Sequence, residues 1–390
     1  MSKVIRCSVV VSTLFLTICA RVPLAQKQER WHGPPTRRMS VPQRSGLVGN
    51  KLRTDITDTI DRSLDWLATK QNADGFWSDR NCPALTALPV RAFAASKHKK
   101  KTNAVAKGVL HILSCVRKDG GICVTGAKGK GGLANYNTAI CMAALHATGD
   151  ASLLKTVRNA RKFITNAQYL GSDDYRGGFG YDRASGTTYA DLRSTFYALD
   201  AMAETASAET YRPPGEARID INWNETVKYV KKAQNTGAAG PGQAGGFSSK
   251  PSDGRIFFRS YGSMTYSGML ALIHADVSRD DVRVRSAFDW SVKHWSLKEN
   301  PGMGGQGLYF FYNVLARTLS VYDRDIIRLA DGRTSVNWRV DLARKIMDLQ
   351  KKDPKTGHGY WSNKDGRFWE NDPVLVTAYA VLTLQTILKE

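Results

Sequence analysis

The most informative segment of this chain is Leu64-Asp-Trp-Leu-Ala-Thr-Lys-Gln-Asn-Ala-Asp-Gly-Phe-Trp77. It begins in an amphipathic helix, whose apolar side chains recur at helical spacing: Ile56, Ile60, Leu64 and Leu67. The helix ends at a glutamine, and a turn with glycine and aromatic residues follows. Beyond the turn, the apolar stretch from Thr86 to Ala95 predicts a second helix that is buried on several sides. One unit therefore consists of two helices joined by a glycine-aromatic turn.

Units of this kind recur along the chain at a period of about 40–55 residues, which indicates a repeat architecture. Their glycine-containing turns are Gly75-Phe-Trp77, Gly120-Gly121, Gly177-Gly-Phe-Gly180, Gly245-Gly-Phe247, Gly304-Gly-Gln-Gly307 and Gly359-Tyr-Trp361. A helix pair cannot bury its apolar face alone, so neighbouring pairs must stack. An open stack would end in a polar capping repeat, but the last unit ends in the apolar run from Val374 to Leu382. The sequence therefore predicts an all-α protein, a closed ring of six helical hairpins.

A glutamine at the end of the first helix is a second feature that the units share. Gln168, Gln234 and Gln350 occupy the place that Gln71 holds in the first unit, each followed by its turn. This pattern resembles the Gln-Trp (QW) repeat of the squalene-cyclase and protein-prenyltransferase superfamily, over roughly residues 52–390. The resemblance implies an (α/α)6 toroid of the terpenoid-cyclase type. It also implies a ligand cavity inside the ring, reached past the N-termini of the inner helices.

The resemblance assigns candidate site residues to the starts of the inner helices. Asp191 is the candidate catalytic residue, because it begins the segment Asp191-Leu-Arg-Ser-Thr195, which partly matches the acidic motif of the cyclases. The candidate substrate-binding residues are Arg193, Tyr189, Tyr136, Asn137, Tyr261, Tyr266, Tyr309, Tyr312 and Trp369. Aromatic rings line such cavities in terpene cyclases, and packing in a crowded inner barrel is the alternative role for each of them. Asp191 has an alternative role as a helix cap, and we expect Arg193 to keep its carboxylate ionised.

Two departures from the family's motifs argue against its usual chemistry. Cyclases carry Asp-x-Asp-Asp-Thr, with the central Asp as the acid, but Arg193 stands at that position and a guanidinium does not donate a proton. Prenyltransferases bind zinc through an Asp-x-Cys pair and a distant His, a set that this sequence lacks at the matching positions. We therefore expect no metal and no cofactor.

The N-terminus has the order of a signal peptide. Lys3 and Arg6 precede an uncharged stretch from Cys7 to Ala20, and a polar segment follows. We predict a signal peptide over residues 1–25, a flexible basic linker over residues 26–51 and the ring over residues 52–390, and hence export to the periplasm, the cell envelope or the medium. An uncleaved anchor is the alternative. Cys115 and Cys123 either form a disulfide after export or remain buried thiols.

Charge and motifs leave three functions open. The net charge of +21 favours an anionic membrane surface or an acidic ligand, and export argues against nucleic acid. The first function is that of a cyclase-like enzyme acting on a polyisoprenoid or another hydrophobic, lipid-like molecule. The second is that of a non-catalytic envelope protein that binds a ligand or serves as a scaffold. The third is that of a carbohydrate-active enzyme, for which Asp191, Glu370 and Asp372 are the carboxylates near the mouth.

Overall fold

The computed structural model describes residues 48–124, 133–182, 190–252 and 257–389. All of them belong to one unit of the chain, residues 33–390. The predicted signal peptide lies outside the described residues. Helix α1 begins at Asn50, slightly before residue 52, and Val48 is already buried in the core.

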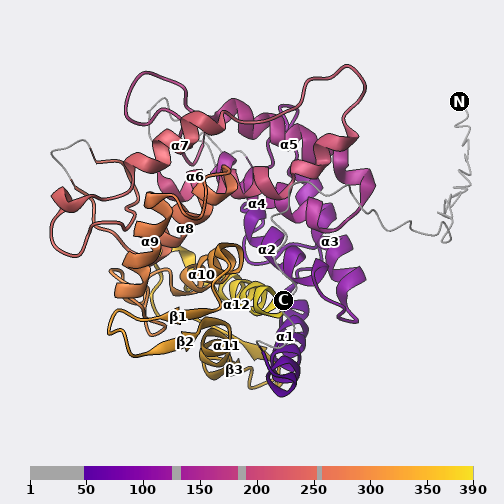
Figure 1. Cartoon of the computed structure of the whole chain (residues 1–390). Coiled ribbons are helices and arrows are strands. Elements are labelled where there is room, and N and C mark those ends of the chain that lie inside the picture. The colour runs from indigo at the N-terminus through magenta and orange to yellow at the C-terminus, as the bar shows by residue number, and fades with distance from the viewer. Residues whose placement is uncertain (1–47, 125–132, 183–189, 253–256, 390) are drawn as a thin grey trace, which may run out of the picture. The chain divides into compact units, whose positions relative to one another are not determined.

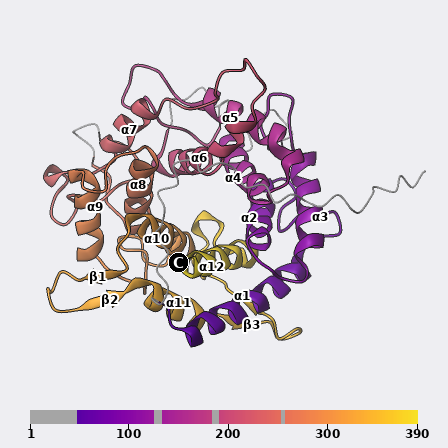
Figure 2. The same ribbon diagram turned by 45° about the vertical axis from the view of Figure 1, so that its right-hand side comes forward.

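Within the described residues, helices of two kinds alternate along the chain (Figure 1). The outer helices are α1 (Asn50–Lys70), α3 (Lys101–Ser114), α5 (Leu154–Ala167), α7 (Trp223–Lys232), α9 (Val282–Lys293) and α11 (Trp338–Asp348). The inner helices are α2 (Pro83–Ala94), α4 (Ala134–Ala147), α6 (Leu192–Glu204), α8 (Gly262–His274), α10 (Leu308–Tyr322) and α12 (Pro373–Leu388). Each inner helix packs against the next one, and α12 packs against α2, so the inner barrel closes (Figure 2). The predicted closed ring of helix pairs is confirmed.

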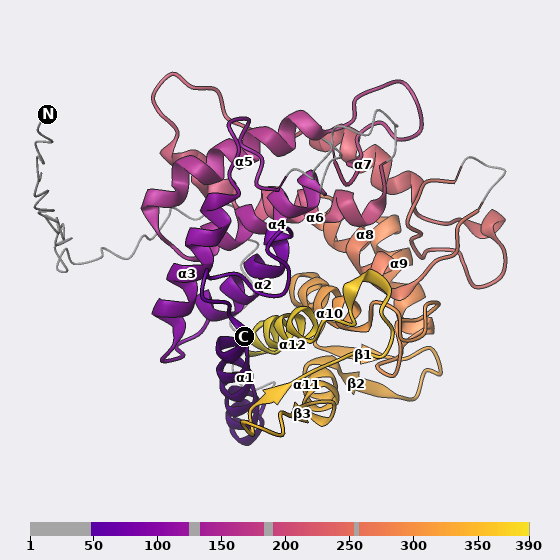
Figure 3. The ribbon, with the colours of Figure 1, turned by 180° about the vertical axis from the view of Figure 1, so that it is seen from behind.

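Short elements occupy the connections. Strands β1 (Ile326–Arg328) and β2 (Ser335–Asn337) form one antiparallel pair, and β3 (Lys351–Lys352) and β4 (Gly359–Tyr360) form another (Figure 3). Single 3-10 turns cover Ala151–Leu153, Ala206–Tyr211, Gly237–Ala239 and Arg367–Trp369. None of the helices in the described ranges is long and apolar enough to span a bilayer.

Burial separates the two kinds of helix as the sequence predicted. Outer helix α5 buries one face, which carries Val157, Ala160 and Phe163. Inner helix α8 buries every residue from Gly262 to Ile273, because it contacts both neighbouring inner helices and the outer layer. The cysteines at 82, 115, 123 and 141 are buried free thiols in this structure, so Cys115 and Cys123 are not joined.

The repeated glutamines tie each unit to the next one. The Gln168 amide donates to Gly177 O in its own turn (3.2 Å) and to Asn222 O just before α7 (3.0 Å). Gln234 does the same with Gly245 O and Arg283 O, at 2.9 and 2.8 Å. The amide of Gln350 donates to Ser63 Oγ on α1 at 2.8 Å. This bond joins the last unit to the first and closes the outer layer.

The turn glycines are required where the chain passes close to the next outer helix. Gly177 has a φ of +95°, and a Cβ there would lie 2.1 Å from Glu225 O. No side chain fits at that distance, and the left-handed backbone conformation favours glycine as well. Glycine at this position therefore sets how closely neighbouring units approach.

Candidate functional site

Asp191 caps an inner helix at the mouth where the resemblance placed the active site. Its carboxylate accepts hydrogen bonds from Ser194 N at 2.9 Å and from Ser194 Oγ at 2.8 Å, and it is buried. Burial raises the pKa of Asp191 above its ordinary value, although the bonds to Ser194 and the charge of Arg193 act in the opposite direction. The charge of Arg193, which we expect to favour the ionised carboxylate, is thus opposed by the cost of removing that carboxylate from water.

Arg193 fills the N-terminal end of the barrel. Its guanidinium lies 3.5 Å from the ring centre of Phe368 and 5.0 Å from that of Phe310. The side chain is buried, and Nη2 has no hydrogen-bond partner among the residues that the structure describes. Phe368 and Trp369 both have positive φ angles, 62° and 64°, an uncommon conformation for bulky residues. Phe368 is thus held over Arg193 by a strained segment.

Other predicted site residues contribute to packing more than to a common site. Asn137 Oδ1 accepts from Ala84 N at 3.1 Å and so holds the start of α2. The ring of Tyr266 packs against Phe311, between α8 and α10. These two predicted residues serve the structure of the barrel wall.

The remaining predicted aromatic residues divide between the wall, the surface and the barrel centre. Tyr309 packs edge-on against Tyr312, whose hydroxyl donates to Leu297 O at 2.6 Å. Trp369 is 44% exposed. Tyr261 stands at the N-cap position of α8, buried, and the nearby positive charge of Arg193 partly offsets the rise that burial causes in its pKa.

Of the predicted residues, Tyr136 does reach the aromatic centre of the barrel. Its ring meets that of Tyr197 edge-on, with 5.0 Å between the ring centres. Tyr189 lies outside the described residues.

The other carboxylates at this mouth are also helix caps. Glu370 accepts from Tyr309 N and Phe310 N at the start of α10, at 3.1 and 2.8 Å. Asp372, directly before Pro373, accepts from Val374 N at 2.8 Å and caps α12. Each of the three carboxylates considered for carbohydrate chemistry therefore satisfies backbone N–H groups of a first helical turn.

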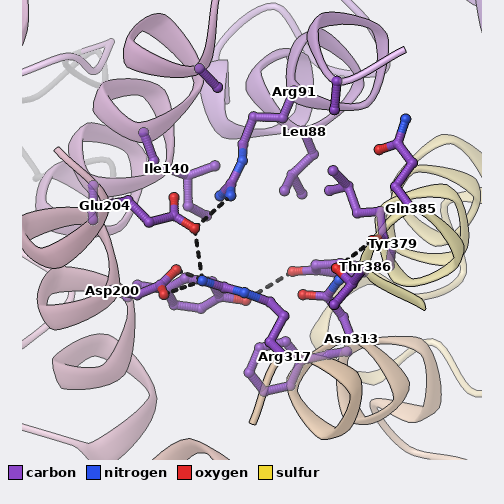
Figure 4. A pocket seen from close by; sticks show the side chains of 18 of the residues that line it. Leu88, Arg91, Ile140, Asp200, Glu204, Asn313, Arg317, Tyr379, Gln385 and Thr386 are labelled. Carbon is purple, nitrogen blue, oxygen red and sulfur yellow. Dashed lines mark hydrogen bonds and ion pairs between the residues drawn. The ribbon is translucent and has the colours of Figure 1, made fainter. Parts of the chain in front are cut away.

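A cavity of about 140 Å³ lies toward the C-terminal ends of the inner helices. Its walls come from α2, α4, α6, α10 and α12 (Figure 4). The lining residues are Leu88, Arg91, Ala95, Ala139, Ile140, Ala143, Ala147, Phe196, Tyr197, Asp200, Ala201, Glu204, Phe310, Asn313, Arg317, Tyr379, Leu382, Gln385, Thr386 and Lys389.

Aromatic side chains separate this cavity from Arg193. The hydroxyls of Tyr197 and Tyr379 share a hydrogen bond of 2.8 Å across the barrel. The ring of Phe310 lies between them, 5.6 Å from the ring of Tyr197 and 6.0 Å from that of Tyr379. Burial raises the pKa of both tyrosines well above its ordinary value, so both phenols stay neutral. The floor of the cavity is therefore uncharged.

A network of ion pairs crosses the cavity above this floor (Figure 4). Arg317 on α10 donates through both terminal nitrogens to Asp200 on α6, with Nη1 2.7 Å from Oδ2. Its Nη2 also donates to Glu204 Oε1 at 2.8 Å, and Arg91 on α2 reaches the same oxygen at 2.9 Å. His274 on α8 lies 3.3 Å from Asp200. Four inner helices are thus connected through these charges.

The electrostatics of the network keep its central carboxylate ionised. Burial alone would raise the pKa of Asp200, but the charge of Arg317 and the hydrogen bonds from His274 and Arg317 hold it well below its ordinary value. Asp200 and Glu204 in turn raise the pKa of Arg317. The charges of Asp200 and Arg317 are therefore fixed at neutral pH.

Gln385 on α12 presents an unused hydrogen-bond acceptor. Its Nε2 donates to Ala92 O at 2.8 Å, which fixes the orientation of the amide. The side chain lines the cavity and is only 8% exposed, and within the described part of the chain its buried Oε1 has no hydrogen-bond partner. A buried acceptor without a donor is costly, so a partner at this position would be favourable.

Sequence reasoning missed this cavity because it concentrated on helix starts. The missed residues are Arg91, Asp200, Glu204, Arg317 and Gln385. A signal was present, since each of these lies in an otherwise apolar inner helix, where a polar side chain needs a partner. Among the described residues, no group of three or more His, Cys, Asp or Glu side chains is placed to hold a metal ion.

Comparison with known proteins identifies the fold. No family model and no curated protein matches this sequence. Among solved structures, the type II terpene cyclase MstE from Scytonema, in complex with merosterolic acid A, matches with a TM-score of 0.52 at 12% identity, over 86% of this chain and 98% of that one. This chain has the terpenoid-cyclase toroid fold.

The same toroid also carries carbohydrate enzymes. An α-1,6-mannanase of Salegentibacter in complex with α-1,6-mannotriose matches with a TM-score of 0.55 at 11% identity, over 86% of this chain and 100% of that one. A D-mannose isomerase matches with a TM-score of 0.52 at 9% identity, over 87% and 99% of the two chains. At such identities the likeness concerns the fold alone, and the function has to be argued from the residues of this chain.

Proposed function

We propose that this chain is an exported, non-catalytic binding protein that holds a small polar molecule in the cavity at the C-terminal ends of its inner helices. The observation that carries the proposal is the ion-pair network of Arg91, Glu204, Arg317 and Asp200, which lines an open space in the barrel. Charged side chains that face a cavity can form hydrogen bonds with a polar ligand, whereas an apolar ligand would displace their water and offer no hydrogen bonds in its place. Export follows from the N-terminal sequence pattern and is part of the proposal.

The cavity gives less support to the polyisoprenoid ligand that the sequence resemblance implied. Pockets for drug-sized ligands measure roughly 300–1,000 Å³, and this one measures about 140 Å³. The N-terminal end of the barrel, where a cyclase would hold its acid, contains Arg193 between Phe310 and Phe368. Both features argue against room for a long hydrocarbon chain beside a proton donor.

The cavity also gives little support to glycoside hydrolysis. Asp200 and Glu204 form a carboxylate pair one turn apart on α6, but both are bound to arginine. A glycosidase needs one carboxyl group that is protonated near neutral pH, with a raised pKa. The pKa of Asp200 is instead lowered by Arg317. Binding without bond cleavage is the activity that fits these side chains best.

A variant at the rim of the cavity tests the proposal. Ala147 lines the cavity and is exposed, so a tryptophan there should block entry without disturbing the core. The control is Ala151→Trp, an equally exposed alanine that does not line the cavity. Small sugars, cyclitols, amino acids, organic acids and isoprenoid alcohols are screened by thermal shift and calorimetry.

We expect at least one small polar compound to bind the wild type and the control but not Ala147→Trp. Binding of isoprenoid alcohols alone, or cyclisation of squalene by the purified wild type, would overturn the proposal. So would the absence of binding by every compound in the screen.

A further inference from the structure

We infer that the ligand of this cavity is a neutral molecule rich in hydroxyl groups, of the monosaccharide or cyclitol class, and that Gln385 selects it by accepting a hydrogen bond from one hydroxyl. This inference rests on the proposed binding function and names the chemistry of the ligand. Three features of the cavity carry it: its balanced charge, its unused acceptor and its aromatic floor.

The charges within the ion-pair network cancel, and Lys389, an exposed residue just beyond the end of α12, adds a positive charge to the lining. Arg91 and Arg317 are matched by Glu204 and Asp200, and each carboxylate already contacts a guanidinium. A carboxylate or phosphate ligand would have to take an arginine from its partner and leave that buried carboxylate uncompensated. An ammonium ligand would face the same problem in reverse. A neutral ligand leaves the pairs intact and can still bond to their outward-facing atoms.

The acceptor on Gln385 requires a donor from the ligand. Because Nε2 is held by Ala92 O, the amide cannot rotate to present its donor side without losing that bond. Oε1 therefore stays an acceptor, and a ligand hydroxyl is the neutral group that can both satisfy it and accept from a neighbouring donor. Asn313 on α10 and Thr386 on α12 add neutral polar groups to the same wall.

The floor of the cavity suits the apolar face of a ring. Phe310, Tyr197 and Tyr379 form this floor, and both phenols are already bonded to each other. Their hydroxyls are thus largely engaged, and the ring surfaces remain for apolar contact. A sugar or cyclitol combines a face of C–H groups with an edge of hydroxyls. The arrangement of an aromatic floor below a polar wall matches that division.

The test compares neutral and charged compounds of one size on the full chain without its predicted signal. Binding of myo-inositol, D-glucose and D-mannose is measured by calorimetry beside gluconate and glucosamine, with farnesol in detergent as the apolar compound. Monodeoxy forms of the sugar that binds most tightly are then measured on wild type and on Gln385→Leu. Gln71→Leu is the matched control, because Gln71 also donates to backbone carbonyls but lies at the end of an outer helix.

We expect a neutral compound to bind most tightly and Gln385→Leu to weaken it about tenfold. One deoxy form should bind wild type about tenfold more weakly than the parent sugar does, whereas Gln385→Leu should bind that form and the parent sugar equally well. A merely structural role of Gln385 would not produce this difference. Gln71→Leu should keep the wild-type preference among the deoxy forms. Preferential binding of gluconate, glucosamine or farnesol, blocked by Ala147→Trp, would overturn this inference and leave a cavity-binding function standing. Equal losses on all deoxy forms in both proteins would overturn the role of Gln385. Binding of none of the compounds would overturn the proposed function itself.

Discussion

Replacing Arg317 with methionine should lower the free energy of unfolding by about 3 kcal/mol, because it leaves the buried carboxylate of Asp200 without its guanidinium and the partly exposed Glu204 with Arg91 alone. Arg317 donates through both terminal nitrogens to Asp200 and through one of them to Glu204. Breaking a buried pair of this kind costs about 3–5 kcal/mol. The cavity admits water to this region, so the lower end applies. For a chain of this size the midpoint of thermal unfolding should fall by about 4 °C.

The pH dependence of stability should also change sign. In the folded wild type the pKa of Asp200 is lowered. Its contribution to stability is therefore fully present above about pH 3.9, the pKa of an aspartate in the unfolded chain, and is lost as the pH falls through the folded-state pKa. Without Arg317, burial raises this pKa, so the contribution is present at acid pH and lost as the pH rises. His274 faces Asp200 from α8, with Nε2 3.3 Å from Oδ1. Glu204 is on the same helix as Asp200, and Arg91 from α2 still faces it.

Urea unfolding followed by circular dichroism at pH 4 and pH 7 measures both effects. The difference in free energy of unfolding between wild type and Arg317→Met should be smaller at pH 4 than at pH 7. The double variant Asp200→Asn with Arg317→Met removes the central carboxylate together with its partner and should recover part of the loss. If Arg317→Met lowers the free energy of unfolding by less than about 1 kcal/mol, or if its difference from wild type is larger at pH 4 than at pH 7, the claim that this network is buried and mutually dependent is refuted.

Three further predictions concern the ends of the barrel and the chain. Asp191→Ala should lower the free energy of unfolding by about 1 kcal/mol, as the loss of a helix cap does, and leave binding in the cavity unchanged. Urea unfolding and calorimetry measure these two effects. A large loss of affinity with normal stability would instead mark Asp191 as a site residue. Trp369→Gly should lower the midpoint of thermal unfolding, because the loss of a large ring that is only 44% exposed, together with the freedom that glycine gives the unfolded chain, outweighs the relief of a left-handed conformation that costs about 1–2 kcal/mol; a raised midpoint would show that the strain dominates. N-terminal sequencing of protein from fractionated cells should find a start near residue 26 outside the cytoplasm, and a cytosolic product beginning at Met1 would contradict export.

The fold followed from the sequence because its signals are local and repeated. A glutamine such as Gln168 can be recognised by its sequence spacing from the glycine turn that follows it. The structure explains this spacing, because its amide donates hydrogen bonds both to that turn and to the residue that precedes the next outer helix. The same bond from Gln350 to Ser63 closes the ring. The start of the ring needed more than the pattern, since Val48, which precedes the predicted boundary at residue 52, is buried in the core.

The site was harder to predict because an acidic residue at the start of a helix can serve either as a cap or as a catalytic group. Asp191, Glu370 and Asp372 are acidic residues at the starts of inner helices, where a carboxylate serves equally well as a cap or as a catalytic group. Only the positions of the backbone N–H groups decide between these roles, and all three carboxylates accept from them. Likewise, the charge of Arg193 favours an ionised Asp191, while burial, which the motif does not reveal, acts in the opposite direction.

The interior of each inner helix offers a better criterion than its start. On α6 the residues Arg193, Tyr197, Asp200 and Glu204 follow one another at spacings of three or four, so they share one helix face from the N-terminal to the C-terminal end. An inner helix is buried on all sides, and an ionised side chain within it can be compensated only where other inner helices converge, which is the barrel axis. The carboxylates of α6, Asp200 and Glu204, find opposite charges on other inner helices, where Arg91 and Arg317 provide them, whereas Arg193 packs against aromatic rings. In this ring, the ion pairs between inner helices mark the position of the cavity, and they do so without any match to a catalytic motif.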